Sequence, residues 1–146
     1  MNINEIKIED NSKYLKLVEG ENQFRIVSEF VMRDVPYKTG QVATKYTCFV
    51  IDRKDGKVKF ADFGASIIKQ IQSLAGSREY GFDSVPKYDM FITREGTGQF
   101  DTKYTLRAAR QDSELTVEEA QMVVALPPID KAFDEKGDMK VSEIPF

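Results

Sequence analysis

The residues best suited to chemistry lie together in the segment 45–63, KYTCFVIDRKDGKVKFADF, where cations crowd a turn and aromatic side chains flank it. The cations at the turn are Arg53, Lys54, Lys57 and Lys59, and the aromatic residues on the two arms are Tyr46, Phe49, Phe60 and Phe63. Cations interleaved with flat rings suit a ligand that has a charged backbone and planar bases. Single-stranded nucleic acid is such a ligand.

Other kinds of chemistry are disfavoured by composition. The chain has one cysteine, Cys48, and no histidine, which excludes an intramolecular disulfide, a Cys/His zinc site and histidine-assisted nucleophilic catalysis. Cys48, in an apolar run, is interpreted as a small core residue. The carboxylates fall at expected turns or on outward-facing strand positions, and their spacing indicates no metal cluster. We therefore predict a non-enzymatic protein without a metal or cofactor.

The turn determines which side chains share a face. Lys54-Asp55-Gly56 predicts a three-residue connection with Gly56 in the left-handed conformation. That register pairs Arg53 with Lys57 and Phe49 with Ala61. A two-residue Asp55-Gly56 turn would change these pairs. The three-residue turn places on one face Lys45, Phe49, Arg53, Lys57, Lys59 and Phe63.

The neighbouring segments predict the elements that hold this hairpin. Before it, we expect strand at 14–18 and 23–31, bent near Gly20, and a loop at 32–41. After it, the apolar spacing of 65–75 predicts an amphipathic helix with Ser66 as N-cap and Gly76 as its stop. Further strands are expected at 88–94 and 102–108. The fold class is therefore mainly β, an OB-fold with five strands and one helix between strands 3 and 4.

The C-terminal part differs from this body. Thr116 to Glu119 has the pattern of a capping box and predicts a short helix that ends at Pro127. Through residue 108 the chain has 17 basic and 15 acidic residues, and beyond it 4 basic and 9 acidic residues. We expect a loose N-terminus at 1–12, the OB-fold domain at 13–108, a linker and short helix at 109–128, and an acidic disordered tail at 129–146. We also expect the tail to compete weakly for the basic groove.

The sequence favours a cytoplasmic protein. Its N-terminus lacks the layout of a signal peptide, and no apolar run approaches the roughly 20 residues that cross a bilayer. No membrane partner is therefore expected. A homo-oligomer is compatible with the sequence.

Two sets of motifs resemble known proteins. YLKLVEGENQFRIV, FVIDRKDGKVK, SIIKQIQSLA and KYDMFITREGTGQFDTKYTL resemble, in that order, a phage-type single-stranded DNA-binding protein over roughly residues 13–108. The resemblance implies an OB-fold that coats single-stranded DNA in DNA replication, recombination and repair, in the host cytoplasm if a phage encodes it. The C-terminus is similar to the acidic tip of bacterial single-stranded DNA-binding proteins. That similarity implies recruitment of replication or recombination proteins by Glu143, Ile144, Pro145 and Phe146.

Together these arguments define a predicted DNA-binding set. Phosphate contacts are assigned to Lys45, Arg53, Lys54, Lys57 and Lys59. Phe49 and Phe63 are candidates for base stacking, although either could belong to the core. Further candidates are Tyr37, which could equally be a packed loop residue, and Arg94, Lys103 and Arg107. The main alternative is an OB-fold scaffold or protein-interaction subunit that binds no nucleic acid itself. The residues do not distinguish DNA from RNA.

Overall fold

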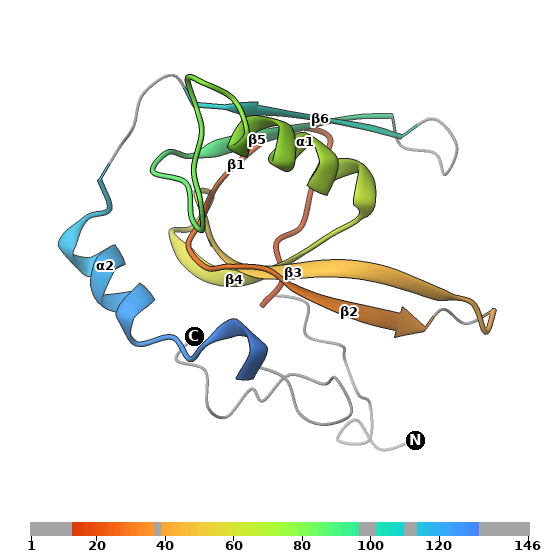
Figure 1. Cartoon of the computed structure of the whole chain (residues 1–146), viewed down its shortest axis with the longest axis horizontal. Coiled ribbons are helices and arrows are strands. Elements are labelled where there is room, and N and C mark those ends of the chain that lie inside the picture. Colours follow the sequence, from red (N-terminus) through yellow and green to blue (C-terminus); the bar gives the residue numbers. More distant parts are fainter. Residues whose placement is uncertain (1–12, 37–38, 97–101, 110–113, 132–146) are drawn as a thin grey trace, which may run out of the picture.

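The computed structural model describes residues 13–36, 39–96, 102–109 and 114–131. This part of the chain is mainly β, with a six-stranded antiparallel sheet and two α-helices (Figure 1). The strands are β1 (Gly20–Ile26), β2 (Val31–Pro36), β3 (Val42–Asp52), β4 (Lys57–Phe63), β5 (Met90–Glu95) and β6 (Lys103–Ala108). The helices are α1 (Ala65–Ala75), α2 (Val117–Val124) and the short 3-10 helix η2 (Ile129–Lys131).

Strand β3 organises the sheet, whose order is β2-β3-β1-β5-β6 with β4 paired to β3. The second half of β3 pairs with β1, where Ile26 lies opposite Val50, and its first half pairs with β2, where Val31 lies opposite Thr47. β1 and β2 are thus successive stretches along one edge of β3, and β4 occupies the other edge. The prediction of a loop at 32–41 is wrong for residues 32–36, because the chain continues along β3 as a strand as far as Pro36, whereas residues 39–41 belong to no strand or helix.

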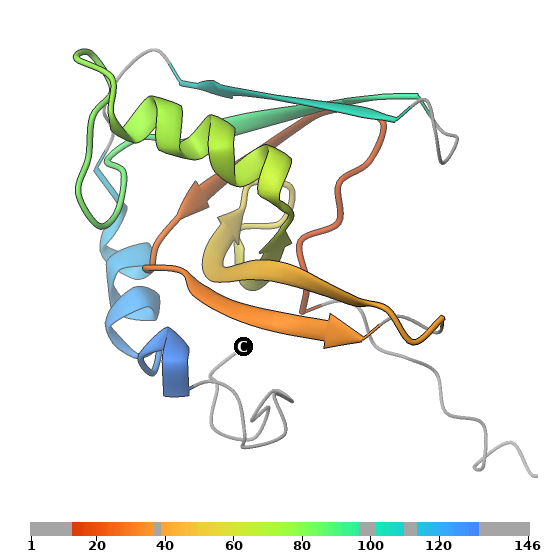
Figure 2. The same cartoon turned by 45° about the vertical axis from the view of Figure 1, so that its right-hand side comes forward.

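The sheet curves around one hydrophobic core. β1, β5 and β6 lie on one side of the molecule and β2, β3 and β4 on the other (Figures 1 and 2). The inward side chains of both groups bury one another, and α1 adds Ile67, Ile68 and Ile71, as its apolar spacing predicts. Gly64 is the N-cap of this helix instead of Ser66, while Gly76 ends it as expected. The other buried members are Phe24, Ile26, Cys48, Val50, Ala61, Phe63, Tyr88, Met90 and Ile92.

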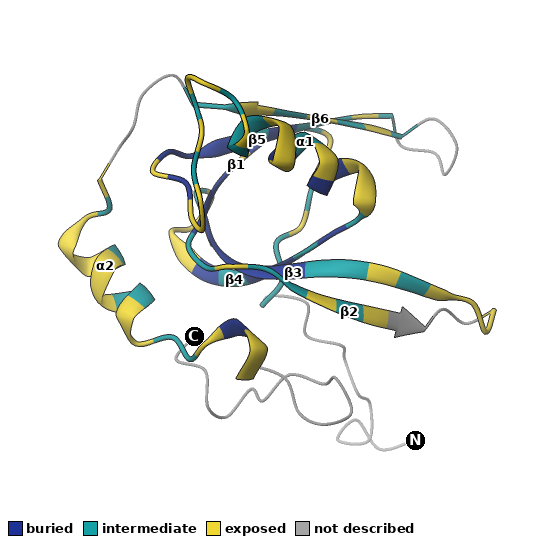
Figure 3. Ribbon diagram, in the orientation of Figure 1, coloured by how far each residue is buried: buried dark blue, intermediate teal, exposed yellow. Residues whose placement is uncertain are grey.

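A second core covers the opposite face of the β3–β4 hairpin. Its buried residues are Phe49, Ile51, Val58, Phe60 and Ile129 (Figure 3). Side chains from α2 and from the segment that follows it pack against this cluster, so both faces of the hairpin are buried. The near-continuous apolar run of β3 is typical of a strand covered on both sides. Residues 129–131, expected within the tail, form η2, and Ile129 belongs to this core.

Residues 13–19 form a strap across the free edge of β4. The N–H of Leu15 donates to the carbonyl of Phe60, and the N–H of Phe60 donates to the carbonyl of Lys13, each at 2.7 Å. These bonds accompany a single parallel bridge between Tyr14 and Phe60, where a strand at 14–18 was expected. The strap therefore covers part of the edge that β4 would otherwise expose.

Buried Asn22 fixes the end of this strap. Its Oδ1 accepts a hydrogen bond from the N–H of Val18 at 2.9 Å, and its Nδ2 lies 2.9 Å from the carbonyl oxygen of Val18 and 3.0 Å from that of Ile92. One amide side chain therefore connects the strap, β1 and β5.

None of the helices in the described ranges has the length and apolar character needed to span a membrane.

Candidate nucleic-acid interface

The β3–β4 hairpin has a longer turn than predicted. Asp52 pairs with Lys57, so four residues, 53–56, form the connection. Phe49 consequently lies opposite Phe60, and the predicted pairing of Phe49 with Ala61 is wrong. Gly56 has φ +71°, in agreement with the predicted left-handed conformation. The one-residue shift moves the cations relative to the apolar face.

The two aromatic residues assigned to base stacking are core residues in this conformation. Phe49 belongs to the second core and Phe63 to the first, and each is 1% exposed. The ring of Phe49 stacks on Phe60, and the ring of Phe63 contacts those of Phe24 and Phe30. A base cannot reach either ring without opening the core. We therefore correct their assignment from ligand contacts to packing.

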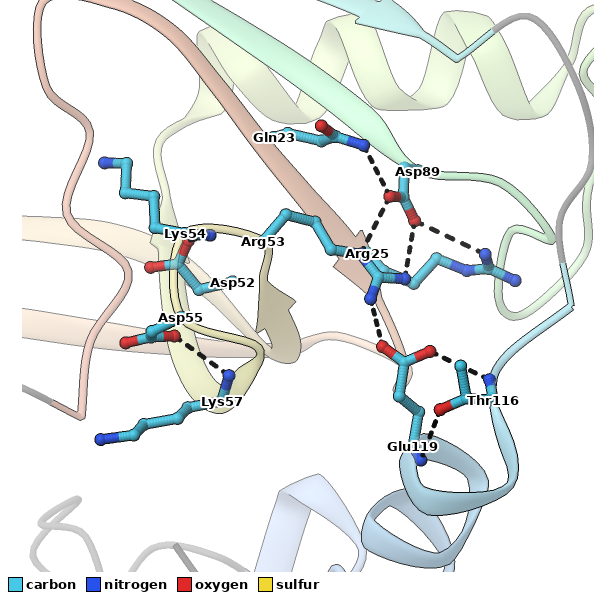
Figure 4. A network of polar contacts seen from close by, with 10 residues as sticks. All are labelled: Gln23, Arg25, Asp52, Arg53, Lys54, Asp55, Lys57, Asp89, Thr116 and Glu119. Carbon is cyan, nitrogen blue, oxygen red and sulfur yellow. Dashed lines mark hydrogen bonds and ion pairs between the residues drawn. The ribbon is translucent and has the colours of Figure 1, made fainter.

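Arg53 is held by two carboxylates from distant parts of the chain (Figure 4). Its Nε and Nη2 donate to the carboxylate of Asp89 at 2.9 and 3.1 Å, and its Nη1 forms an ion pair with Glu119 at the start of α2. Burial is the largest single influence on the pKa of Arg53 and lowers it. The hydrogen bonds and charges of Asp89 and Glu119 together outweigh burial, and the net shift of this pKa is upward.

Asp89 is the centre of this network. It also accepts a hydrogen bond from Nε2 of Gln23 at 2.9 Å, and Nη1 of Arg25 lies 3.6 Å from its Oδ1. Two guanidinium groups therefore face one buried carboxylate. The three partners of Asp89 come from β1 and from the turn after β3, and Arg53 extends the network to Glu119 at the start of α2.

Of the three lysines in and beside the turn, Lys59 forms ion pairs, whereas Lys54 and Lys57 are exposed. Nζ of Lys59 lies 2.8 Å from Asp52 and 2.9 Å from Asp55. Burial lowers the pKa of Lys59, but its hydrogen bonds with Asp52 and Asp55 and their charges raise it by more, so the net shift is upward. Lys59 therefore serves the hairpin itself.

Lys54 and Lys57 are the exposed cations of the turn, and Figure 4 shows their side chains pointing away from the Asp89 network. Nζ of Lys54 lies 3.2 Å from Oδ1 of Asn22 and 3.3 Å from the carbonyl of Lys16, which places it beside the strap. The backbone N–H of Lys57 donates to Oδ1 of Asp55, which orders the turn while its ammonium remains in solvent.

The remaining predicted cations are spread over the sheet. Lys45 is half-buried on β3, with Nζ near Gly64 at the β4–α1 junction. Arg94 donates from Nη1 to the carbonyl of Leu17 at 2.9 Å, and its buried Nε has no hydrogen-bond partner among the described residues. Arg94 thus holds the strap. Lys103 is exposed on β6.

Tyr37 and the tip residues Glu143, Ile144, Pro145 and Phe146 lie outside the described residues.

Arg107 forms a contact that the sequence reasoning missed. Its guanidinium carbon lies 4.1 Å from the centre of the Phe91 ring, and its Nη2 lies 2.8 Å from Glu21. The alternation of Phe91 with buried Met90 and Ile92 was the available signal that Phe91 faces outward. The guanidinium group of Arg107 thus lies over an aromatic ring on the outer face of β5 and β6.

Arg33 was also missed, and it has a structural role. It donates from Nε to Oγ1 of Thr47 at 3.1 Å and from Nη2 to Asp62 at 2.9 Å. No local pattern links residues 29 positions apart, so this pair has no signal in the sequence.

Within the described ranges, no three His, Cys, Asp or Glu side chains gather closely enough to hold a metal ion.

The hairpin turn, the strap and β6 thus present exposed cations, and one of them lies over an aromatic ring. These cations are Lys16, Lys54, Lys57, Lys103 and Arg107. Their ammonium and guanidinium groups can bind phosphate, and the Phe91–Arg107 pair offers a planar surface. Comparison of the chain with protein families, curated proteins and solved structures finds no match.

Proposed function

We propose that the chain is a sequence-tolerant single-stranded DNA-binding protein built on an OB-type barrel. The observation that carries the proposal is the strand arrangement around β3. If β1 and β2 are counted as one interrupted strand, five strands run in the order β4-β3-β1/β2-β5-β6, with α1 between the third and fourth along the chain. Five strands with one helix in that position are the layout of an OB-fold, which binds oligonucleotides around its second and third strands. Here these are β3 and β4.

The exposed cations support a phosphate-binding role for the turn end of this hairpin. Lys54 and Lys57 are exposed there, and Lys16 lies on the adjacent strap. Each lysine that neutralises a phosphate releases counterions, which makes affinity fall steeply as salt rises. The core aromatics, by contrast, are no longer part of the proposed interface. Stacking is instead assigned to the outward Phe91–Arg107 pair, because aromatic rings and guanidinium planes both stack on bases.

Fluorescence anisotropy of labelled oligo-dT at two salt concentrations tests the proposal. We expect saturable binding at low salt that weakens markedly at high salt, with duplex DNA a poor competitor. A competition arm with oligo-U distinguishes DNA from RNA. If no saturable binding occurs at low salt, the alternative of an OB-type scaffold is favoured.

The acidic tail adds a second part to the proposal. We propose that its tip, Glu143 to Phe146, docks on replication or recombination proteins in the cytoplasm where the DNA is copied. We also propose that the tail weakens DNA binding by competing for the cationic surface. A truncation to test this should begin after Lys131, because Ile129 is buried in the second core. The truncated chain should bind oligo-dT more tightly at low salt, and unchanged or weaker binding would contradict the competition.

A further inference from the structure

Arg53 faces two carboxylates, and one of them belongs to α2. Asp89 faces the guanidinium groups of both Arg25 and Arg53, whereas Glu119 pairs with Arg53 from the start of α2. The side chains of Arg53 and Glu119 are 24% and 12% exposed, so α2 stands between this positive site and solvent. Glu119 of the same chain therefore occupies the anion-binding position beside Arg53.

The helix that carries Glu119 is attached only lightly. No residue of α2 is buried, and Val117 and Val124 are strongly exposed. Met122 and Val123 contact the second core at its margin, and the nearest buried anchor is Ile129, beyond the helix. The capping box with Thr116 aims the carboxylate of Glu119, because its Oε1 accepts the N–H of Thr116 while Oε2 faces Arg53. Displacing α2 from β3 and β4 therefore uncovers little apolar surface from the helix itself.

We propose that Arg53 is a phosphate-binding site of the DNA interface and that Glu119 occupies it in the absence of DNA. The inference rests on the proposed function. Asp89 binds Nε and Nη2 of Arg53 and so holds the guanidinium in place, while Nη1 is the nitrogen that exchanges partners. A DNA phosphate oxygen replaces the carboxylate oxygen at Nη1, and one anion is substituted for another without leaving the site uncompensated. Release of Glu119 detaches the start of α2 from the hairpin.

A matched pair of substitutions on α2 tests this exchange. Glu119→Gln removes the charge that faces Arg53 but keeps a residue type that completes a capping box. Glu118→Gln removes the same charge one residue earlier, from an exposed side chain in the same helical turn. Both variants therefore raise the net charge equally, and circular dichroism confirms that each is folded. Only Glu119→Gln frees the Arg53 site.

Oligo-dT anisotropy at low salt compares the wild-type chain with the two variants. We expect Glu119→Gln to bind at least about threefold more tightly than Glu118→Gln, the scale of a partly buried ion pair. Equal affinities of the two variants, with clear binding by the wild type, would overturn the Arg53 site alone. Absence of binding by all three proteins would overturn the proposed function and this site with it. Binding by Glu119→Gln alone would support both.

Hydrogen exchange of the wild-type chain gives a second readout that needs no variant. Saturating oligo-dT should speed amide exchange in 117–124, because DNA displaces Glu119 from Arg53. Exchange in the α1 amides, which lie on the other core, serves as the internal reference. Unchanged or slower exchange in α2 at saturation would show that Glu119 keeps its place and would overturn the proposal.

Discussion

Phe49 and Phe60 stack on each other across β3 and β4, with ring centroids 4.9 Å apart and planes inclined by 29°. They can do so because the four-residue turn places them directly opposite each other. A three-residue turn would instead have placed Phe49 beside Ala61. The turn length thus places the stacked Phe49 and Phe60 in the core, while Lys54 and Lys57 are the exposed cations of the hairpin.

Phe49→Ala tests the packing role of this ring. Removal of a fully buried aromatic side chain leaves a cavity, and we expect a loss of about 3–5 kcal/mol of unfolding free energy. Urea denaturation followed by circular dichroism measures it. The oligo-dT affinity of the fraction that remains folded should be nearly unchanged. A well-folded variant with weakened binding would return Phe49 to the interface.

Lys57→Met tests the phosphate-binding role of the turn. Lys57 is exposed and its side chain points into solvent, so its removal should change stability by less than about 0.5 kcal/mol. It should weaken oligo-dT binding and reduce the slope of log affinity against log salt by about 0.7, the amount expected for one lost phosphate contact on a single strand. Titrations at several salt concentrations measure the slope. An unchanged slope would remove Lys57 from the interface.

Lys59→Met, two residues along the same strand, should behave in the opposite way. The ammonium of Lys59 compensates Asp52, whose side chain is 3% exposed. Its removal leaves a buried carboxylate without its ion-pair partner, at a cost of about 2–4 kcal/mol. Denaturation midpoints of the two lysine variants provide the comparison. A Lys59→Met protein as stable as Lys57→Met would show that the Asp52 pair contributes little.

Asn22→Ala tests the attachment of the strap. The substitution leaves backbone groups of Val18 and Ile92 without their side-chain partner, and we expect a loss of about 1–3 kcal/mol. Limited proteolysis should also become faster between residues 13 and 19, because the strap loses its anchor to β1. Ser66→Ala, at an exposed helix position, is the control. Unchanged proteolysis would show that the bonds to Phe60 hold the strap on their own.

The Glu119–Arg53 pair should give a characteristic pH dependence of stability. Burial raises the pKa of Glu119, but the Thr116 hydrogen bond and the Arg53 hydrogen bond and charge lower it by more. A carboxyl whose pKa is lowered by folding stabilises the native state above its unfolded pKa, about 4.3, and loses that contribution as the pH falls through its folded value. The free energy of unfolding of the wild type should therefore exceed that of Glu119→Gln by about 1 kcal/mol at pH 7. This difference should shrink below about pH 4.3. Denaturation of both proteins from pH 7 to 3 measures it, and a difference that grows with acid would contradict the pairing.

The sequence predicted the elements whose signals are local. The apolar period of 65–75 and the glycine that follows give α1 with its observed bounds, and the capping box at Thr116 marks the start of α2. The strands predicted at 88–94 and 102–108 correspond to β5 and β6, and each end lies within two residues of the prediction. Propensity and periodicity are properties of a few neighbouring residues, so a single sequence contains them.

The sequence did not predict the features that depend on distant partners. β2 contains polar residues and ends at Pro36, and only its pairing with β3 makes it a strand. The partners of Arg53 were not predicted, because nothing near it in the sequence reveals Asp89 and Glu119, 36 and 66 residues away. For the same reason, α2 was predicted as a helix, but its position over the hairpin was not. Long-range ion pairs are set by topology, which local patterns do not encode.

Because Cys48 is buried, the reactivity of its thiol reports on opening of the first core. Cys48 is the only cysteine of the chain and its side chain is fully buried in the first core; burial, helped by the nearby charge of Asp62, raises the pKa of its thiol. The thiolate is the reactive form, and burial both disfavours it and keeps reagents away. An alkylating reagent therefore reacts with Cys48 only when the core opens. The labelling rate of the unmodified chain therefore measures the rate or the free energy of that opening, and DNA bound to the native state should slow it.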